Sequence, residues 1–357
     1  MAKKRLLRTE GILAMATRAI RTIRRDPISD LAQFEAFACN VPHANPPTPD
    51  AKTPDVRVFR EFRNHEIVTP DGRRIPMWIF ADPQKPSSFP SEAMRFREGQ
   101  LVHSTASLSV NTHTIHHHGI EPTPFNDGVG HTSFEPSGNY TYQFSTEVDG
   151  TYFYHCHKNT VLHFEMGLYG MLLIDPPEGE GFVRRANAVV PYDVEAVWAV
   201  DDIDPLWHDF HHDAGFSCPN GENAGLNDFR PEHFLISGVF SPDTREDPRV
   251  TVRARLGQTI LIRLLNAGYT IQTTTFHPDV TPEIIALDGR TLGDPRHSRY
   301  SRPRQLLANQ GIRLSSAQRV NLLIRPQKRG RFPVTFEYRQ YVQGDLLHTA
   351  ETFIEVI

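Results

Sequence analysis

Short runs of apolar residues, separated by turn residues, follow one another from residue 55 to the end of the chain. Runs of four to eight residues that alternate or are continuously apolar, bounded by Gly, Pro, Asn and Asp, are typical of β-strands. The clearest runs cover residues 140–144, 151–154, 170–174, 259–265, 320–324 and 332–336. We therefore expect an all-β protein built from two Greek-key β-sandwiches.

Breaks in this pattern suggest four regions. Residues 1–54 hold a basic segment, with eight Lys or Arg among the first 25 residues and apolar residues at helical spacing, followed by a proline-rich linker. We expect a short basic helix there. Residues 55–178 form the first β-block, residues 179–225 an irregular polar connector, and residues 226–357 the second β-block.

Composition excludes several classes of protein. No apolar stretch approaches the ~20 residues that a membrane-spanning helix needs. A net charge of −4 argues against a general nucleic-acid-binding protein. Three cysteines are too few for a disulfide framework. The apolar residues 11–16 are too short for a secretory signal, so the sequence leaves the cellular compartment unassigned.

Histidine is the residue type that points to chemistry. The chain has 18 histidines, and nine of them lie between residues 103 and 163. His155, Cys156 and His157 follow a predicted strand, where successive side chains point to opposite faces. The two imidazoles can therefore serve one metal site and the thiolate another, with a short covalent path between them.

A second histidine motif runs from His113 to Gly119 and reads HTIHHHG. Strand parity puts His116 and His118 on one face, where they can join His155 and His157, and His113 on the other face with Cys156. His163 follows Cys156 by seven residues. Two imidazoles and a thiolate are the blue-copper ligand set, which normally has a weak axial ligand.

We expect the remaining histidines of these regions not to bind metal. We expect His117 to be a bystander, and His103 and His131 to be ordinary histidines without a metal. In the connector, WHDFHH could bind a metal, but we expect its three histidines to be solvated in a loop: His208, His211 and His212.

These motifs resemble those of the multicopper oxidases, which are built from plastocyanin-like cupredoxin domains. Residues 113–119 are similar to the family's HxxHxHG motif, and residues 150–174 to the motif that carries its copper cysteine. Residues 263–268 of the second block are also similar to a plastocyanin-like domain, more generically.

The resemblance implies a type 1 copper held by His113, Cys156 and His163. Leu168, which cannot ligate, takes the axial position, with Met166 as its rival. The resemblance also implies that four histidines supply half of a second centre, of type 2 and type 3 copper: His116, His118, His155 and His157.

Two departures from the family pattern matter. The interval from Cys156 to His163 is two residues longer than usual. The second block has one histidine, His277, in the segment 266–277 where the other cluster ligands would be, so we expect this block to lack metal. A second copy or a partner chain would then have to complete the second copper centre.

Three functions fit this sequence. The first is a multicopper oxidase-like enzyme that takes single electrons from a small-molecule or metal-ion reductant and passes them to oxygen. The second is an enzyme that resembles copper nitrite reductase, although His116 stands where that family has an acid. The third is a blue-copper electron carrier or copper-binding protein without catalytic activity. The family is mostly periplasmic or extracellular.

Overall fold

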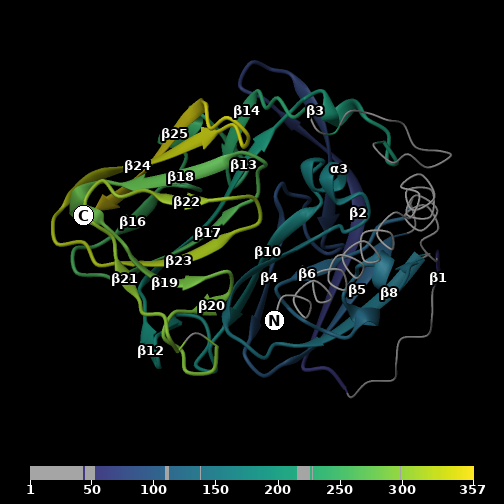
Figure 1. The fold of residues 1–357 in the computed structure, drawn as a ribbon, viewed down its shortest axis with the longest axis horizontal. Coiled ribbons are helices and arrows are strands. Elements are labelled where there is room, and N and C mark those ends of the chain that lie inside the picture. The colour runs from purple at the N-terminus through teal and green to yellow at the C-terminus, as the bar shows by residue number, and fades with distance from the viewer. Residues whose placement is uncertain are drawn as a thin grey trace, which may run out of the picture.

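The structure is a computed structural model that describes residues 43–44, 53–108, 112–136, 138–214, 226, 228–297 and 299–357. The expected basic N-terminal helix lies outside the described residues, as do Cys39 and Cys218. Nearly all regular structure in the described part is β-strand, arranged in two bodies that lie side by side (Figure 1).

The first body pairs two four-stranded sheets. One sheet has the order β4 (Ser91–Arg97), β10 (Tyr169–Asp175), β9 (Gly150–His155), β6 (His116–His118). The other has the order β3 (Arg74–Ala81), β2 (Val56–Val68), β5 (Leu101–Leu108), β8 (Gly138–Ser145). Their inward-facing aromatic and aliphatic residues form one core, which includes Phe80, Tyr142 and Leu172.

The second body contains the C-terminus and pairs a larger sheet with a five-stranded one (Figure 1). The larger sheet is ordered β15 (Val239–Phe240), β14 (His233–Ile236), β13 (Val194–Ile203), β17 (Ile260–Asn266), β23 (Arg319–Ile324), β19 (Glu283–Leu287), β20 (Arg290–Thr291), with β21 (Arg304–Gln305) on β19. The other is ordered β16 (Val252–Ala254), β25 (Leu346–Val356), β24 (Gly330–Arg339), β18 (Ile271–Phe276), β22 (Ile312–Leu314).

Short elements complete the described chain. Two small ribbons pair β1 (His43–Ala44) with β7 (Glu135–Pro136), and β11 (Phe182–Arg185) with β12 (Ala188–Pro191). The only described α-helix is α3 (Thr160–Glu165), and the 3-10 turns are η1 (Pro124–Asn126), η2 (Gly130–Thr132), η3 (Trp207–Asp209), η4 (Asp243–Arg245) and η5 (Pro278–Val280).

The expectation that residues 179–225 are an irregular connector is wrong for their first half. Strand β13 pairs in parallel with β17 and is a central strand of the second body. Its apolar pattern is interrupted by Asp201 and Asp202, which are nevertheless buried. The Tyr169 hydroxyl donates to Asp201, and the Thr270 amide donates to Asp202, so these carboxylates are satisfied inside the protein.

The two bodies are joined by apolar and ionic contacts. Phe153 and Leu173 of the first body pack with Leu265 of the second. Arg263, which is 1% exposed, donates to Glu195 at 2.6 Å and to Asp175 at 3.1 Å. Arg263 of the second body thus reaches Asp175 of the first, and separating the bodies would break this buried ion pair.

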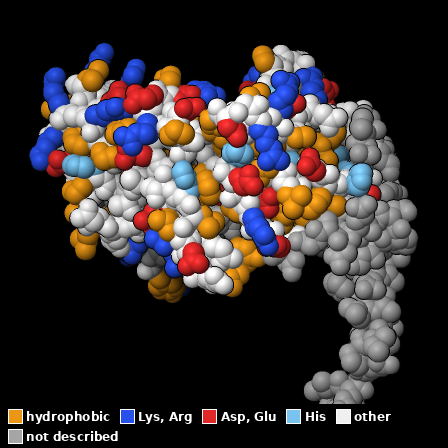
Figure 2. Space-filling model, turned by 90° about the horizontal axis from the view of Figure 1, so that it is seen from above, with side chains coloured by type: hydrophobic (Ala, Val, Ile, Leu, Met, Phe, Trp, Pro, Cys, Tyr) orange, Lys and Arg blue, Asp and Glu red, His pale blue; other side chains and the backbone are white. Residues whose placement is uncertain are grey.

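On the surface, acidic and basic side chains are interspersed across the face that Figure 2 shows. Among the described residues, no helix is long and apolar enough to cross a membrane.

Candidate metal centre

Cys156 lies where the first sheet turns back on itself. Strand β9 ends at His155, and the chain returns along β10 after α3. The Cys156 amide donates to the Leu168 carbonyl at 3.0 Å, which closes the base of this excursion. Helix α3 begins after Asn159, whose φ of 41° is left-handed, and carries His163 in its last turn. The excursion therefore brings His163 back over Cys156.

His113, Cys156 and His163, which we call the Cys156 triad, converge in the structure. The Cys156 Sγ lies 3.3 Å from His163 Nδ1 and 3.7 Å from His113 Nδ1. All three side chains are fully buried. One nitrogen from each imidazole and the sulfur lie within 4.8 Å of one another. His113 belongs to no strand, so the loop before β6 places it.

Aromatic rings surround the triad. Phe62 stacks on His113 at 4.3 Å between centroids, and the Trp78 ring meets His163 edge-on at 5.2 Å. Burial lowers the pKa of both triad histidines well below the usual value, so the imidazoles are neutral. Burial raises the pKa of the Cys156 thiol to about 12, so a bound metal ion would displace its proton.

The two axial candidates lie in different surroundings. Leu168 is in the same core cluster as Cys156. Met166 packs in another cluster, with Leu162 and Trp207. This packing favours the apolar Leu168 as the neighbour of the triad.

His116, His118, His155 and His157, which we call the histidine tetrad, also come together. His116 and His155 are paired neighbours on β6 and β9. The ring of His116 lies 5.4, 5.2 and 5.3 Å from the rings of His118, His155 and His157. Donor nitrogens of His116, His118 and His155 lie within 4.8 Å of one another, whereas His157 is outside that group.

Hydrogen bonds orient two of these imidazoles. His155 Nδ1 donates to the Cys156 carbonyl at 2.7 Å, and His116 Nδ1 donates to the Asp127 carbonyl at 2.7 Å. Because a carbonyl only accepts, each Nδ1 carries the proton and each Nε2 keeps its lone pair, which in His155 faces His118 Nδ1 at 3.2 Å. Such partners commonly orient metal-binding histidines.

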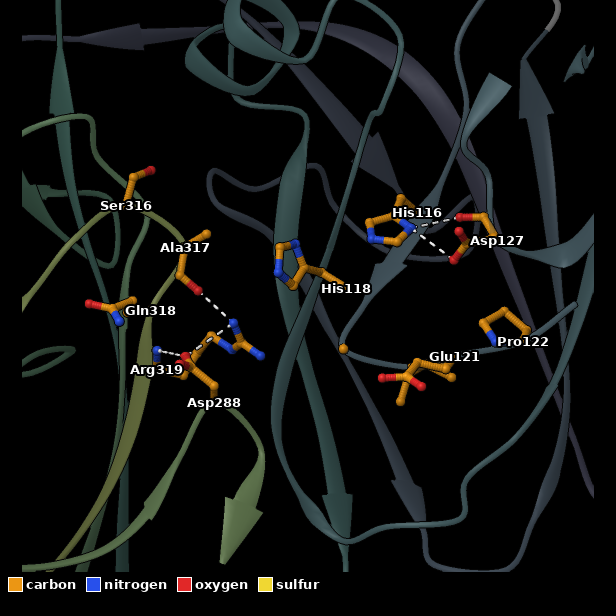
Figure 3. A pocket seen from close by; sticks show the side chains of 12 residues that line it. His116, His118, Glu121, Pro122, Asp127, Asp288, Ser316, Ala317, Gln318 and Arg319 are labelled. Carbon is orange, nitrogen blue, oxygen red and sulfur yellow. Dashed lines mark hydrogen bonds and ion pairs between the residues drawn. The ribbon is translucent and has the colours of Figure 1, made fainter. Parts of the chain in front are cut away.

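The tetrad lines a cavity of about 270 Å³ between the two bodies. The second body contributes Tyr269, Ser316 and Ala317 to this cavity, and none of these is a usual copper ligand. A neighbouring pocket runs from His116 and His118 to Arg319 (Figure 3). There Arg319 donates to the Ala317 carbonyl at 2.6 Å and lies 3.3 Å from Asp288. The one histidine in residues 266–277 of the second body, His277, does not line the cavity; its ring lies against Phe332.

The donor sets fit copper. A buried thiol with two neutral imidazoles matches the blue-copper set, and the neighbouring imidazoles suit a second copper. Two nitrogens of these imidazoles, His113 Nε2 and His157 Nδ1, are buried without a hydrogen bond. An imidazole nitrogen buried without a partner is otherwise costly.

The expectation for the connector histidines is wrong in two of three cases. His208 is buried and donates from Nδ1 to the Pro76 carbonyl at 2.6 Å. The ring of His212 lies 4.5 Å from the ring of His163 and 4.8 Å from that of His113. Only His211 is exposed. The aromatic residues around WHDFHH were the signal for burial, since Trp207 lies in a core cluster.

Comparisons with known proteins match the segment that holds both groups of histidines. Residues 71–179 match the family model described as multicopper oxidase. The chain is 32% identical over 161 residues to L-ascorbate oxidase from Cucumis sativus, which covers 42% of this chain and 24% of that protein. It is 38% identical over 105 residues to copper resistance protein A from Pseudomonas syringae pv. tomato, which covers 28% of this chain and 17% of that protein. The chain thus spans about a quarter or less of these relatives.

The fold also has solved counterparts. The blue copper oxidase from Nitrosomonas europaea superposes with a TM-score of 0.63 and 21% identity, over 84% of this chain and 85% of that one. This likeness supports the all-β, cupredoxin-like fold over both bodies. The matched segment, residues 71–179, includes the Cys156 triad and the tetrad, so this part of the chain is similar to a multicopper oxidase domain.

Proposed function

We propose that this chain is a copper-dependent oxidoreductase of the multicopper oxidase type. The Cys156 triad is its type 1 copper site and the histidine tetrad is part of its second copper centre. A small-molecule or metal-ion reductant gives up single electrons, and oxygen is the acceptor. The convergence of a buried thiol and two neutral imidazoles at one point is the observation that carries this proposal.

Copper in these sites would supply reversible one-electron chemistry. The protein contributes the short connection between them, because Cys156 of the triad is covalently flanked by His155 and His157 of the tetrad. His155 Nδ1 also donates to the Cys156 carbonyl, which gives a second, hydrogen-bonded connection. Asp127 orients His116 at the open side of the tetrad.

The four histidines of the tetrad are half of the eight that a complete trinuclear copper cluster needs. The residues of the second body that face it offer no imidazole. We therefore propose that a second copy or a partner chain supplies the missing ligands when the enzyme reduces oxygen. The same observation favours one alternative, a blue-copper electron carrier that uses the Cys156 triad alone.

A copper-loading experiment tests the assignment. The wild type, Cys156→Ser and the control Cys218→Ser are loaded with copper, and blue absorption and oxygen uptake with a one-electron reductant are recorded. The proposal is supported if the wild type and the control show both blue colour and oxygen uptake, and Cys156→Ser shows neither. Loss of the colour in Cys218→Ser instead would overturn it. Blue colour without oxygen uptake would favour the electron carrier.

A further inference from the structure

A short stretch of the connector lies directly on the Cys156 triad. We call residues 211–214 the cap segment. The His212 carbonyl accepts a hydrogen bond from His163 Nε2 at 2.9 Å. The His212 ring packs against both triad imidazoles and lies 5.9 Å from the Trp78 ring. As a result, the Nε2 edge of His163 does not reach solvent.

The cap segment is anchored at several points. His212 Nε2 donates to the Thr112 carbonyl at 3.0 Å, next to His113 in the chain. Ala214 is 1% exposed and packs in the core cluster of Trp207 and Phe229. Neither contact would survive a rotation of the segment away from the triad.

The longer interval between Cys156 and His163 supplies the remaining anchor. Asn159 lies in this interval, and its Nδ2 donates to the carbonyls of His212 at 3.3 Å and of Ala214 at 2.8 Å. Its left-handed backbone conformation, which Asn adopts more readily than most residues, directs the amide toward the cap segment. Lys158 lies 3.8 Å from Asp213 of the same segment. Lys158 and Asn159 of this interval thus hold the cap segment in place.

We propose that Asn159 and His212 determine which reductants can use the triad. The cap segment prevents contact between a substrate and the His163 imidazole, so bulky phenols that must touch this edge are excluded. Donors that transfer an electron from outside the cap, such as compact metal complexes, are accepted. This inference rests on the proposed function for the identity of the site, but the closure of the site is a property of the chain itself.

The closure can be tested without copper. Copper-free protein is treated with diethyl pyrocarbonate, which modifies accessible neutral imidazoles, and labelling of each histidine is followed by peptide mass spectrometry. His211, which is exposed, is the internal reference. We expect His163 to react about tenfold or more slowly than His211, because labelling requires local opening of the cap.

Two variants remove the cap in different ways. Asn159→Gly deletes the amide but keeps the left-handed backbone, and His212→Ala deletes the ring. Both should raise the labelling rate of His163 about fivefold or more, whereas Asp209→Ala, an exposed neighbour, should leave it within about twofold. Circular dichroism confirms that each variant is folded. Labelling of His163 as fast as His211 in the wild type would overturn the proposal, and so would unchanged labelling in a folded Asn159→Gly protein.

A second arm tests reductant choice in copper-loaded protein. The bleaching of blue absorption is timed with a bulky phenol and with hexacyanoferrate(II). Asn159→Gly should accelerate bleaching by the phenol about fivefold and leave that by the complex within about twofold, since only contact with the imidazole is obstructed. Equal acceleration of both would contradict the specificity role. If the protein forms no blue site, the proposed function fails, while the labelling result still decides whether the cap closes.

Discussion

Leu168 illustrates how one residue adjusts a metal site. Its side chain is fully buried in the core cluster of Cys156, and under the proposed function it takes the axial position of the type 1 site. A leucine offers no lone pair, so nothing donates electron density to a bound copper(II) from this direction. The axial ligand is one of the determinants of the potential of a blue-copper site.

We therefore expect Leu168→Met to lower the reduction potential of the blue copper. The change replaces one apolar side chain with another of similar volume, so its cost in stability should stay below about 1.5 kcal/mol. A spectroelectrochemical titration of the blue band measures the potential. Met166→Leu is the matched control, because Met166 packs in a different cluster and should leave the potential unchanged. A rise in the potential of Met166→Leu, with no change in Leu168→Met, would identify Met166 as the axial residue.

The three histidines of the short strand β6 alternate between its two faces. His116 and His118 face the tetrad cavity, while His117 points into the core, against Phe144 at 4.4 Å. Burial lowers the pKa of His117 to about 3. The folded protein therefore keeps this imidazole neutral at pH values where the unfolded chain is already protonated.

This difference predicts acid sensitivity. Below pH about 6.5 the unfolded state binds a proton that the folded state does not, so stability falls as the pH decreases toward about 3. In copper-free His117→Gln, the free energy of unfolding should depend less steeply on pH between 6 and 4, by up to about 1.4 kcal/mol per pH unit. Denaturant titrations at several pH values measure this slope. The same slope in His117→Gln as in the exposed control His131→Gln would show that His117 does not carry the effect.

At the level of elements, strand parity predicted separate triad and tetrad sites, although His113 and His163 belong to no strand. Cys156 and its two neighbours do lie on opposite sides, although the strand ends at His155. Strand β13 could not be predicted, because its buried Asp201 and Asp202 depend on Tyr169 and Thr270, which are distant in sequence. The position of His212 could not be predicted from the sequence either. It depends on hydrogen bonds from the Asn159 amide to the His212 carbonyl and from the His212 ring to the Thr112 carbonyl.

On the scale of the whole molecule, a buried ion cluster joins the two bodies. Arg263 bridges Glu195 and Asp175, and Arg95 also contacts both acids. Removing the buried guanidinium would leave carboxylates poorly compensated. We expect Arg263→Met to lower the free energy of unfolding by about 3–5 kcal/mol.

An exposed ion pair gives the control for this prediction. Arg253 is 68% exposed and pairs with Glu355 at 2.8 Å, so Arg253→Met should cost about 0–1 kcal/mol. Calorimetry of both variants measures the difference. Similar losses in the two proteins would contradict a special role for the buried cluster in joining the bodies.

Copper content is the most direct test of the account as a whole. A preparation shown to be monomeric is loaded with copper, and metal per chain is measured together with visible and electron paramagnetic resonance spectra. We predict one blue type 1 copper per chain and a total below the four coppers of a complete multicopper oxidase, because the second body offers the tetrad no imidazole. A monomer that holds four coppers and reduces oxygen rapidly, or one without a type 1 signal, would contradict the account.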